Sequence, residues 1–122
     1  MLLTQNQPEY ITATIKEWNH LLKENEYRMI IINVLRNLVL DEKIEVYTFC
    51  IMSNHIHIIW HLSDKTKDSE IRKYFFENTD KKFKKKLENE NLTFLEKFKS
   101  TQKDRAFHFW KKLGPQMAYA EE

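Results

Sequence analysis

Two histidines separated by one isoleucine, His55 and His57, are the residues of this chain best suited to chemistry. They lie in a run rich in β-branched and aromatic residues, and side chains two positions apart on a β-strand point to the same face. Their imidazoles can therefore share one cation, while Ile56 and Ile58 point to the opposite face and anchor the strand in the core. The alternative is that both are ordinary strand histidines held by hydrogen bonds.

Two further residues of this region, His61 and Cys50, are not counted among the predicted metal ligands. His61 has the parity of the pair, but four residues along a strand span roughly 13 Å, which is too far from His57 for shared coordination. We expect it at the surface or around the site. Cys50, the single cysteine, excludes an internal disulfide and fits a reducing cytosol, so a cytoplasmic location is expected. We predict that its side chain is small, apolar and buried.

Composition excludes several classes of function. No apolar run approaches the roughly 20 residues that a transmembrane helix needs, so we expect no membrane partner. Met1–Leu3 is followed by polar residues without a basic region, so no signal peptide is predicted. One glycine in 122 residues leaves no room for a phosphate-binding loop. Nucleotide hydrolysis and dinucleotide redox chemistry are therefore poor hypotheses.

Basic charge is concentrated after the histidine pair. Residues 65–112 carry 15 Lys and Arg against 8 Asp and Glu, although the net charge of the whole chain is +2. Part of this charge lies on a predicted helix, where a solvated helix face is the alternative explanation. The rest surrounds the aromatic segment 107–110, and cations bind phosphates while rings stack on unpaired bases. We expect DNA contacts from Lys103, Arg105, Trp110, Lys111 and Lys112.

Periodicity predicts the elements that position these residues. Alternating, β-rich segments predict strands over 10–15, 44–51, 55–62 and 107–111, with a tight antiparallel connection at Ser53 and Asn54. Apolar residues at helical spacing predict three helices. The first spans 27–40, the second runs from a cap at Ser69 to an interruption at Asn89 and Asn91, and the third spans 92–98. This order indicates an α+β fold, with a ferredoxin-like antiparallel sheet, helices packed on one face, and the histidine pair on a central strand.

The segment 46–60 resembles the HUH segment, histidine-hydrophobe-histidine, of the single-tyrosine transposases. It is most similar to their REP-associated, insertion-sequence-like branch, although Ser53 stands where that branch usually has proline. The likeness extends over most of the chain, through residues 10–15, 18–22, 94–98 and 104–110.

The resemblance implies cleavage and rejoining of single-stranded DNA. In that family two histidines, here His55 and His57, hold a divalent ion, Mg²⁺ or Mn²⁺, which polarises the scissile phosphate. A tyrosine hydroxyl attacks this phosphate and forms a 5′-phosphotyrosine link. Asn54, which precedes the pair, is expected to contact DNA. The implied partners are single-stranded or hairpin DNA and a second copy of the chain in a homodimer.

The chain departs from the family at the nucleophile. The family places its tyrosine on a helix beyond the Phe-Trp segment, which also supplies a third metal ligand, and Tyr119 does not match that motif. We therefore expect one C-terminally shortened domain over 1–122 with an unassigned catalytic residue. The alternative is a non-catalytic single-stranded or hairpin DNA-binding module derived from such a transposase. A metal-dependent hydrolase using the two histidines and a carboxylate is a third hypothesis, without a supporting motif.

Overall fold

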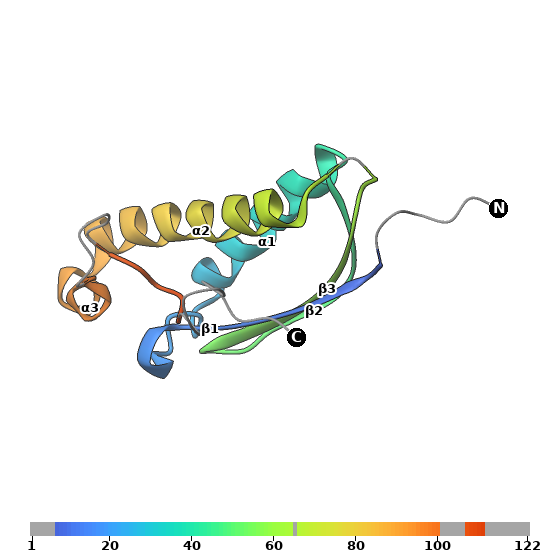
Figure 1. Ribbon diagram of the computed structural model, residues 1–122. Coiled ribbons are helices and arrows are strands. Elements are labelled where there is room, and N and C mark those ends of the chain that lie inside the picture. The colour runs from blue at the N-terminus through green and yellow to red at the C-terminus, as the bar shows by residue number, and fades with distance from the viewer. Residues whose placement is uncertain (1–6, 65, 101–106, 112–122) are drawn as a thin grey trace.

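The computed structural model describes residues 7–64, 66–100 and 107–111 (Figure 1). Its strands are β1 (Glu9–Thr14), β2 (Ile44–Ile51) and β3 (His55–Leu62). Its α-helices are α1 (Asn25–Leu40), α2 (Asp68–Glu90) and α3 (Leu92–Leu95). Two short segments are η1 (Lys16–Trp18), a turn with positive φ at Glu17 and Trp18, and η2 (Glu96–Phe98), a 3-10 turn. Within these described residues, no helix is both long and apolar enough to cross a membrane.

The strands form an antiparallel sheet in the order β1-β3-β2, so the histidine strand is central. In this register His57 lies between Thr12 on β1 and Cys50 on β2. The α+β fold predicted from the element order is confirmed. Segment 107–111 lies beside the end of β1, because the Lys111 N–H donates to the Thr14 carbonyl at 2.7 Å.

The predicted strand over 107–111 is not a continuous strand. Phe107 forms an isolated bridge with Lys99, whereas Trp110 forms one with Ile15. Because the two ends of the segment pair with different parts of the chain, no regular ladder develops between them.

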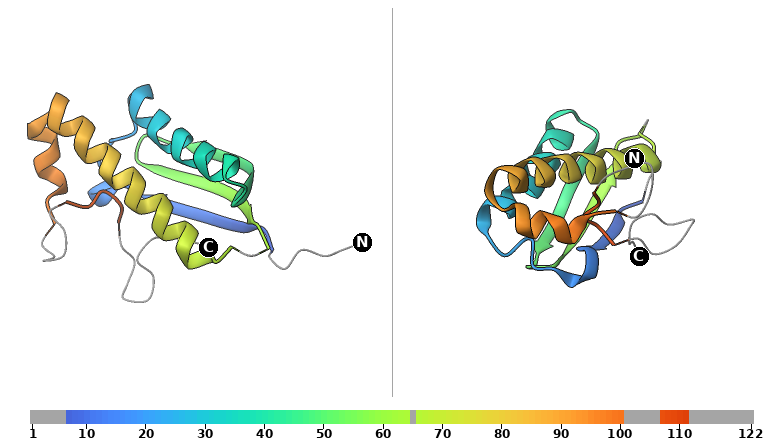
Figure 2. Two further views of the ribbon diagram at one scale, coloured as in Figure 1. Left: turned by 90° about the horizontal axis from the view of Figure 1, so that it is seen from above. Right: turned by 90° about the vertical axis from the view of Figure 1, so that its left-hand side faces the viewer.

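Both long helices cover one face of the sheet (Figures 1 and 2). The helical stripe predicted on α2 is confirmed, since every one of its members is buried: Ile71, Phe75, Thr79, Phe83 and Leu87. The four apolar members pack in one core cluster with Ile56, Ile58 and Trp60 of β3. The helices thus bury one face of the histidine strand and leave the other face uncovered.

The start and end of α2 differ from the prediction. The N-cap is Lys67 rather than Ser69, and Asp68 opens the first turn, where a carboxylate is favoured by the helix dipole and also pairs with Arg72 at 2.7 Å. The helix continues through Asn89, so the predicted interruption there is wrong. Asn91 ends it and caps α3, because its side-chain oxygen accepts the Phe94 N–H at 3.0 Å.

Cys50 also differs from the prediction. It is exposed rather than buried. Because its register partner is His57, it stands on the uncovered face of the sheet.

Candidate metal and nucleic-acid site

The two histidines lie side by side on the uncovered face of β3. Burial alternates along the strand: Ile56, Ile58 and Trp60 are fully buried, whereas His55 and His57 are half-buried. Their ring centroids are 5.0 Å apart, with the ring planes at 89°. The i, i+2 spacing therefore has the geometric consequence predicted from the sequence, and the pair stands on a rigid central strand.

Each imidazole has a hydrogen-bond partner at Nδ1. His55 Nδ1 lies 2.9 Å from Asn54 Oδ1. His57 Nδ1 lies 2.6 Å from the Tyr10 hydroxyl and 3.4 Å from the Thr12 hydroxyl. Tyr10 also stacks on His57, with ring centroids 5.7 Å apart. These contacts set the orientation of both rings.

The partner of His55 defines its tautomer. The Asn54 amide is oriented by its Nδ2, which donates to the Trp18 carbonyl at 3.4 Å, so Oδ1 faces the imidazole. An amide oxygen only accepts, so His55 Nδ1 carries a proton, and in the neutral ring the lone pair is then on Nε2. A hydroxyl can donate or accept, so the 2.6 Å contact with Tyr10 is compatible with the same tautomer in His57, in which its Nδ1–H donates to the Tyr10 oxygen. Such partners orient histidine ligands in metal sites.

The donor set fits part of the coordination shell of a divalent ion. Two neutral imidazole nitrogens suit a transition-metal ion, whereas Mg²⁺ prefers oxygen ligands, so Mn²⁺ fits the pair better than Mg²⁺. Among the described residues, no group of three or more His, Cys, Asp or Glu side chains is arranged to hold a metal ion. The remaining ligands would therefore be oxygen atoms of water or of a phosphate, or side chains outside the described residues.

The β2–β3 turn is tied to the segment after β1. The Ile15 N–H donates to the Asn54 carbonyl at 2.9 Å, and the Leu22 N–H donates to the Ser53 carbonyl at 2.8 Å. His20 Nδ1 lies 2.6 Å from the Ser53 hydroxyl. This last contact needs a hydroxyl at the position where the resembling transposases usually have proline. The turn that begins the histidine strand is thus held in place on one side.

Trp18 was not identified as a site residue from the sequence, although it lies beside this turn. Its side chain is 55% exposed, and Lys111 Nζ lies 5.5 Å from its ring centroid. Tyr10 and Thr12 were missed as well. The alternation of β1 could place Tyr10 and Thr12 on one face of the sheet. Their contact with His57 depends on the β1–β3 register, which the alternation does not specify.

The predicted DNA-binding residues have different positions. Lys111 is exposed, whereas Asn54 is half-buried with both amide atoms engaged. Trp110 is 1% exposed, and its indole N–H donates to the Thr79 hydroxyl at 2.9 Å. A ring buried in this way offers no face to a base, so Trp110 belongs to the core and the stacking expectation does not fit it. The other predicted residues, with Tyr119, lie outside the described residues: Lys103, Arg105 and Lys112.

Ion pairs occupy part of the lysine run on α2. Lys84 pairs with Glu88 at 3.2 Å, and Lys86 pairs with Glu90 at 2.7 Å and with Glu26 at 3.2 Å. These contacts favour the alternative of a solvated, internally compensated helix face for this part of the basic charge.

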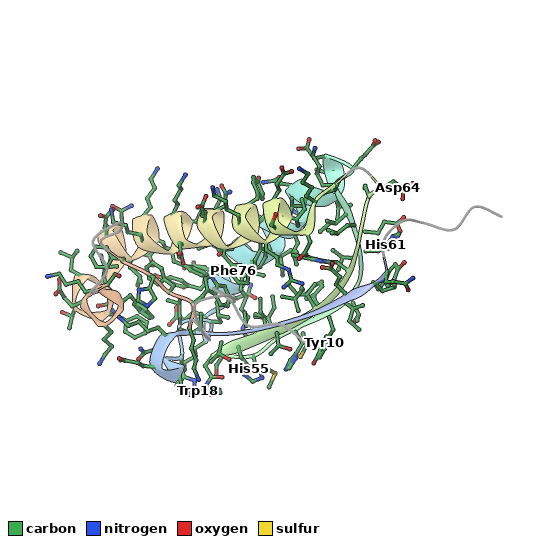
Figure 3. All side chains as sticks on the ribbon, viewed as in Figure 1. Tyr10, Trp18, His55, His61, Asp64 and Phe76 are labelled. Atoms are coloured by element: carbon green, nitrogen blue, oxygen red, sulfur yellow. The ribbon has the colours of Figure 1, made fainter. Side chains whose placement is uncertain are left out.

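His61 lies apart from the pair. Its Nδ1 is 3.7 Å from a Glu45 carboxylate oxygen, and its ring stacks on Tyr47 at 6.2 Å. Figure 3 shows His61 near Asp64 at one end of the sheet and His55 near Trp18 at the other.

No protein-family model and no curated protein matches the chain. Among solved structures, the fold is similar to a candidate transposase from Deinococcus radiodurans R1, with a TM-score of 0.58, 10% identity, and coverage of 73% of this chain and 68% of that one. It is also similar to a REP-associated tyrosine transposase bound to a REP hairpin, with a TM-score of 0.53, 17% identity, and coverage of 93% of this chain and 55% of that one. The chain thus spans about half the length of this second protein. At these identities the likeness establishes a transposase-like fold.

Proposed function

We propose that this chain is a transposase-like DNA-binding protein of the HUH type, in which His55 and His57 hold a divalent metal ion and the uncovered sheet face receives single-stranded or hairpin DNA. The observation that carries the proposal is the pair of imidazoles on the central strand, each with Nδ1 engaged by a neighbour. The transposase-like fold supports it independently.

The side chains of the chain itself have distinct roles in this proposal. Asn54 and Tyr10 contact the two imidazoles at Nδ1, which would leave Nε2 of each ring to hold the ion. The ion, when bound, supplies Lewis-acid polarisation of a DNA phosphate. Lys111 adds a cation at the same end of the sheet, because its Nζ lies over Trp18, whose carbonyl is bonded to Asn54.

The DNA partner is proposed from the fold likeness and the charge. The second similar structure is that of a transposase bound to a REP hairpin. The basic balance of residues 65–112 fits a polyanion. A homodimer, as implied by the resemblance to the single-tyrosine transposases, completes the proposed assembly.

A non-catalytic DNA-binding module is the second candidate function, and one observation favours it. Within the described residues, Tyr10 is the tyrosine whose hydroxyl contacts the pair. That hydroxyl bonds Nδ1 of His57, on the opposite edge of the imidazole from Nε2, so it is placed to orient the ring rather than to attack a phosphate held at Nε2. The proposed metal and DNA binding thus requires no nucleophile from the described residues.

Covalent trapping tests whether the chain transfers DNA strands in addition to the proposed metal and DNA binding. In strand transfer, a tyrosine oxygen bonds to phosphorus as the 3′-hydroxyl leaves, and the protein stays attached to the 5′ end. We expect no such adduct when the 122-residue chain is incubated with Mn²⁺ and a suicide hairpin oligonucleotide and resolved by denaturing electrophoresis. A shifted band that is absent in Tyr119→Phe would establish the transferase and identify Tyr119 as its nucleophile.

DNA binding itself is tested by fluorescence anisotropy. A labelled hairpin with a single-stranded flank is compared with a blunt duplex of equal length, at several salt concentrations. We expect tighter binding of the flanked hairpin and a steep loss of affinity with salt, because phosphate contacts release counterions. Equal affinity for both, or affinity independent of salt, would contradict the proposal.

A further inference from the structure

We propose that Trp18 is a base-stacking residue: an unpaired nucleobase next to the His55 and His57 pair stacks on its indole ring, and Lys111 contacts a phosphate of the same strand. This inference rests on the proposed DNA-binding function and adds a recognition element to it. Three independent features of Trp18 support it, namely its exposure, its backbone conformation and its link to the histidines.

The exposure of Trp18 contrasts with that of the two other tryptophans. Trp60 and Trp110 are 0% and 1% exposed, whereas Trp18 is 55% exposed. Trp18 is not a member of the core cluster, and more than half of its surface stays in water, so packing of the core does not account for a tryptophan at this position. Stacking on an unpaired base would remove this ring from water, and it tolerates any base because each has a π-face.

The backbone holds Trp18 in a conformation that disfavours its residue type. The Asn19 N–H donates to the Lys16 carbonyl at 3.2 Å, closing a turn in which Glu17 and Trp18 have φ values of 54° and 58°. Positive φ values at both central residues are characteristic of type I′ turns, which prefer Asn-Gly because a Cβ is crowded there. A tryptophan in place of glycine is a local conflict of the kind found at functional sites.

Polar contacts link this turn to the histidine pair. The Asn54 side chain donates through Nδ2 to the Trp18 carbonyl and bonds through Oδ1 to His55. Figure 3 places Trp18 and His55 at the same end of the molecule. A base stacked on Trp18 would therefore belong to the same DNA strand as the phosphate that approaches His55 and His57.

Lys111 places a positive charge beside the Trp18 ring, where it can contact a DNA phosphate. Its Nζ lies 5.5 Å from the Trp18 ring centroid, a cation–π distance. More than half of Trp18 remains exposed with this lysine in place, so ring surface is open to a base. An ammonium beside an open aromatic ring matches the alternation of phosphate and base in single-stranded DNA better than it matches an apolar protein partner.

Intrinsic fluorescence tests the proposal directly, because Trp18 is the exposed member of the three tryptophans. We expect a saturable quench when the full chain is titrated with a hairpin that carries a single-stranded thymidine flank, and no saturable quench in Trp18→Phe. Trp18→Ala should weaken binding roughly 5- to 150-fold, the range for loss of one stacked base. Trp18→Tyr should recover most of that loss. Tyr74→Ala, which removes an exposed ring from α2, should change neither quench nor affinity.

Trp18→Gly separates binding from folding. Glycine adopts positive φ without crowding, so this variant should unfold at the same or a higher temperature than wild type while binding DNA as weakly as Trp18→Ala. DNA binding by wild type without a quench, or unchanged affinity in Trp18→Ala, would overturn the role of Trp18 and leave the proposed function standing. An equal quench by blunt duplex would contradict the claim that Trp18 stacks on an unpaired base. Absence of binding to any oligonucleotide would overturn both proposals.

Discussion

Asn54 Oδ1 accepts a hydrogen bond from His55 Nδ1 at 2.9 Å, and in the neutral ring this contact places the lone pair on the opposite nitrogen, Nε2. The asparagine precedes the histidine directly in the chain, and its own orientation depends on the Trp18 carbonyl. One side chain thus connects the turn after β1 to the first proposed metal ligand.

Replacing this side chain should weaken metal binding without removing a ligand. We expect Asn54→Ala to reduce Mn²⁺ affinity roughly 10- to 100-fold, because the tautomer and angle of His55 are no longer set. Isothermal titration calorimetry measures the effect, with Asn37→Ala on α1 as the control. Unchanged affinity would mean that Asn54 does not orient the site.

The tyrosine on the neighbouring strand should have a similar effect on the second ligand. Tyr10→Phe keeps the ring that stacks on His57 but removes the hydroxyl 2.6 Å from Nδ1. We expect about tenfold or greater loss of Mn²⁺ affinity, measured in the same titration. Tyr47→Phe, which removes a hydroxyl from the ring stacked on His61, should bind Mn²⁺ as wild type does. Equal effects of the two variants would argue against a specific role for Tyr10.

Removal of both histidines should separate metal binding from stability. The double variant His55→Ala/His57→Ala should lose Mn²⁺ binding while its free energy of unfolding changes by less than about 1 kcal/mol, since substitutions of side chains outside the core usually have small effects. Urea denaturation and calorimetry on the same preparation measure both quantities. His61→Ala is the control on the same strand. Retained Mn²⁺ binding in the double variant would place the ion elsewhere.

Lys111 should contribute to DNA affinity through one phosphate. We expect Lys111→Ala to weaken binding of all single-stranded sequences alike and to lower the slope of log K against log salt by about 0.7, the value for one contact on a single strand. The matched control is Lys82→Ala, an exposed lysine on α2. A slope that changes equally in both variants would indicate a diffuse effect of charge rather than a contact.

Tyr27 supplies a prediction about stability and pH. Burial, and then the neighbouring Glu90, raise the pKa of Tyr27 to about 12 from its ordinary value of 10.0. Because folding favours the neutral hydroxyl, this contribution is fully present below pH 10 and is lost as the pH rises through 12. The free energy of unfolding should therefore fall more steeply above pH 10 in wild type than in Tyr27→Phe. Urea denaturation between pH 9 and 12 checks this, and an equal decline would contradict it; Tyr74→Phe should behave as wild type.

Local periodicity was sufficient to predict much of the fold. The bounds of β2 and β3 agree with the prediction because a strict alternation of buried and open positions runs through β3 and a short turn joins the strands. The same alternation placed His55 and His57 on one face. The apolar stripes of α1 and α2 were equally informative, because apolar residues on one buried helix face recur every three or four positions, a spacing that distinguishes helices from strands.

Contacts between distant segments were not predictable in this way. Trp110 ends an aromatic run and is followed by two lysines, yet its ring packs against Phe76 and its indole N–H donates to Thr79, contacts that only the tertiary fold creates. The hydroxyl of Tyr10 meets His57 because of strand register. The exposed position of Trp18 could not be predicted, because residues 16–19 contain no glycine to indicate a turn with positive φ values.

The most direct test of the central claim is paramagnetic broadening of the five histidine ring signals by substoichiometric Mn²⁺ in an NMR titration of the full chain. We expect the signals of His55 and His57 to broaden first and together, with those of His20 and His61 following only at higher Mn²⁺. Broadening of His61 before the pair, or equal broadening of all the histidines, would contradict a metal site on His55 and His57.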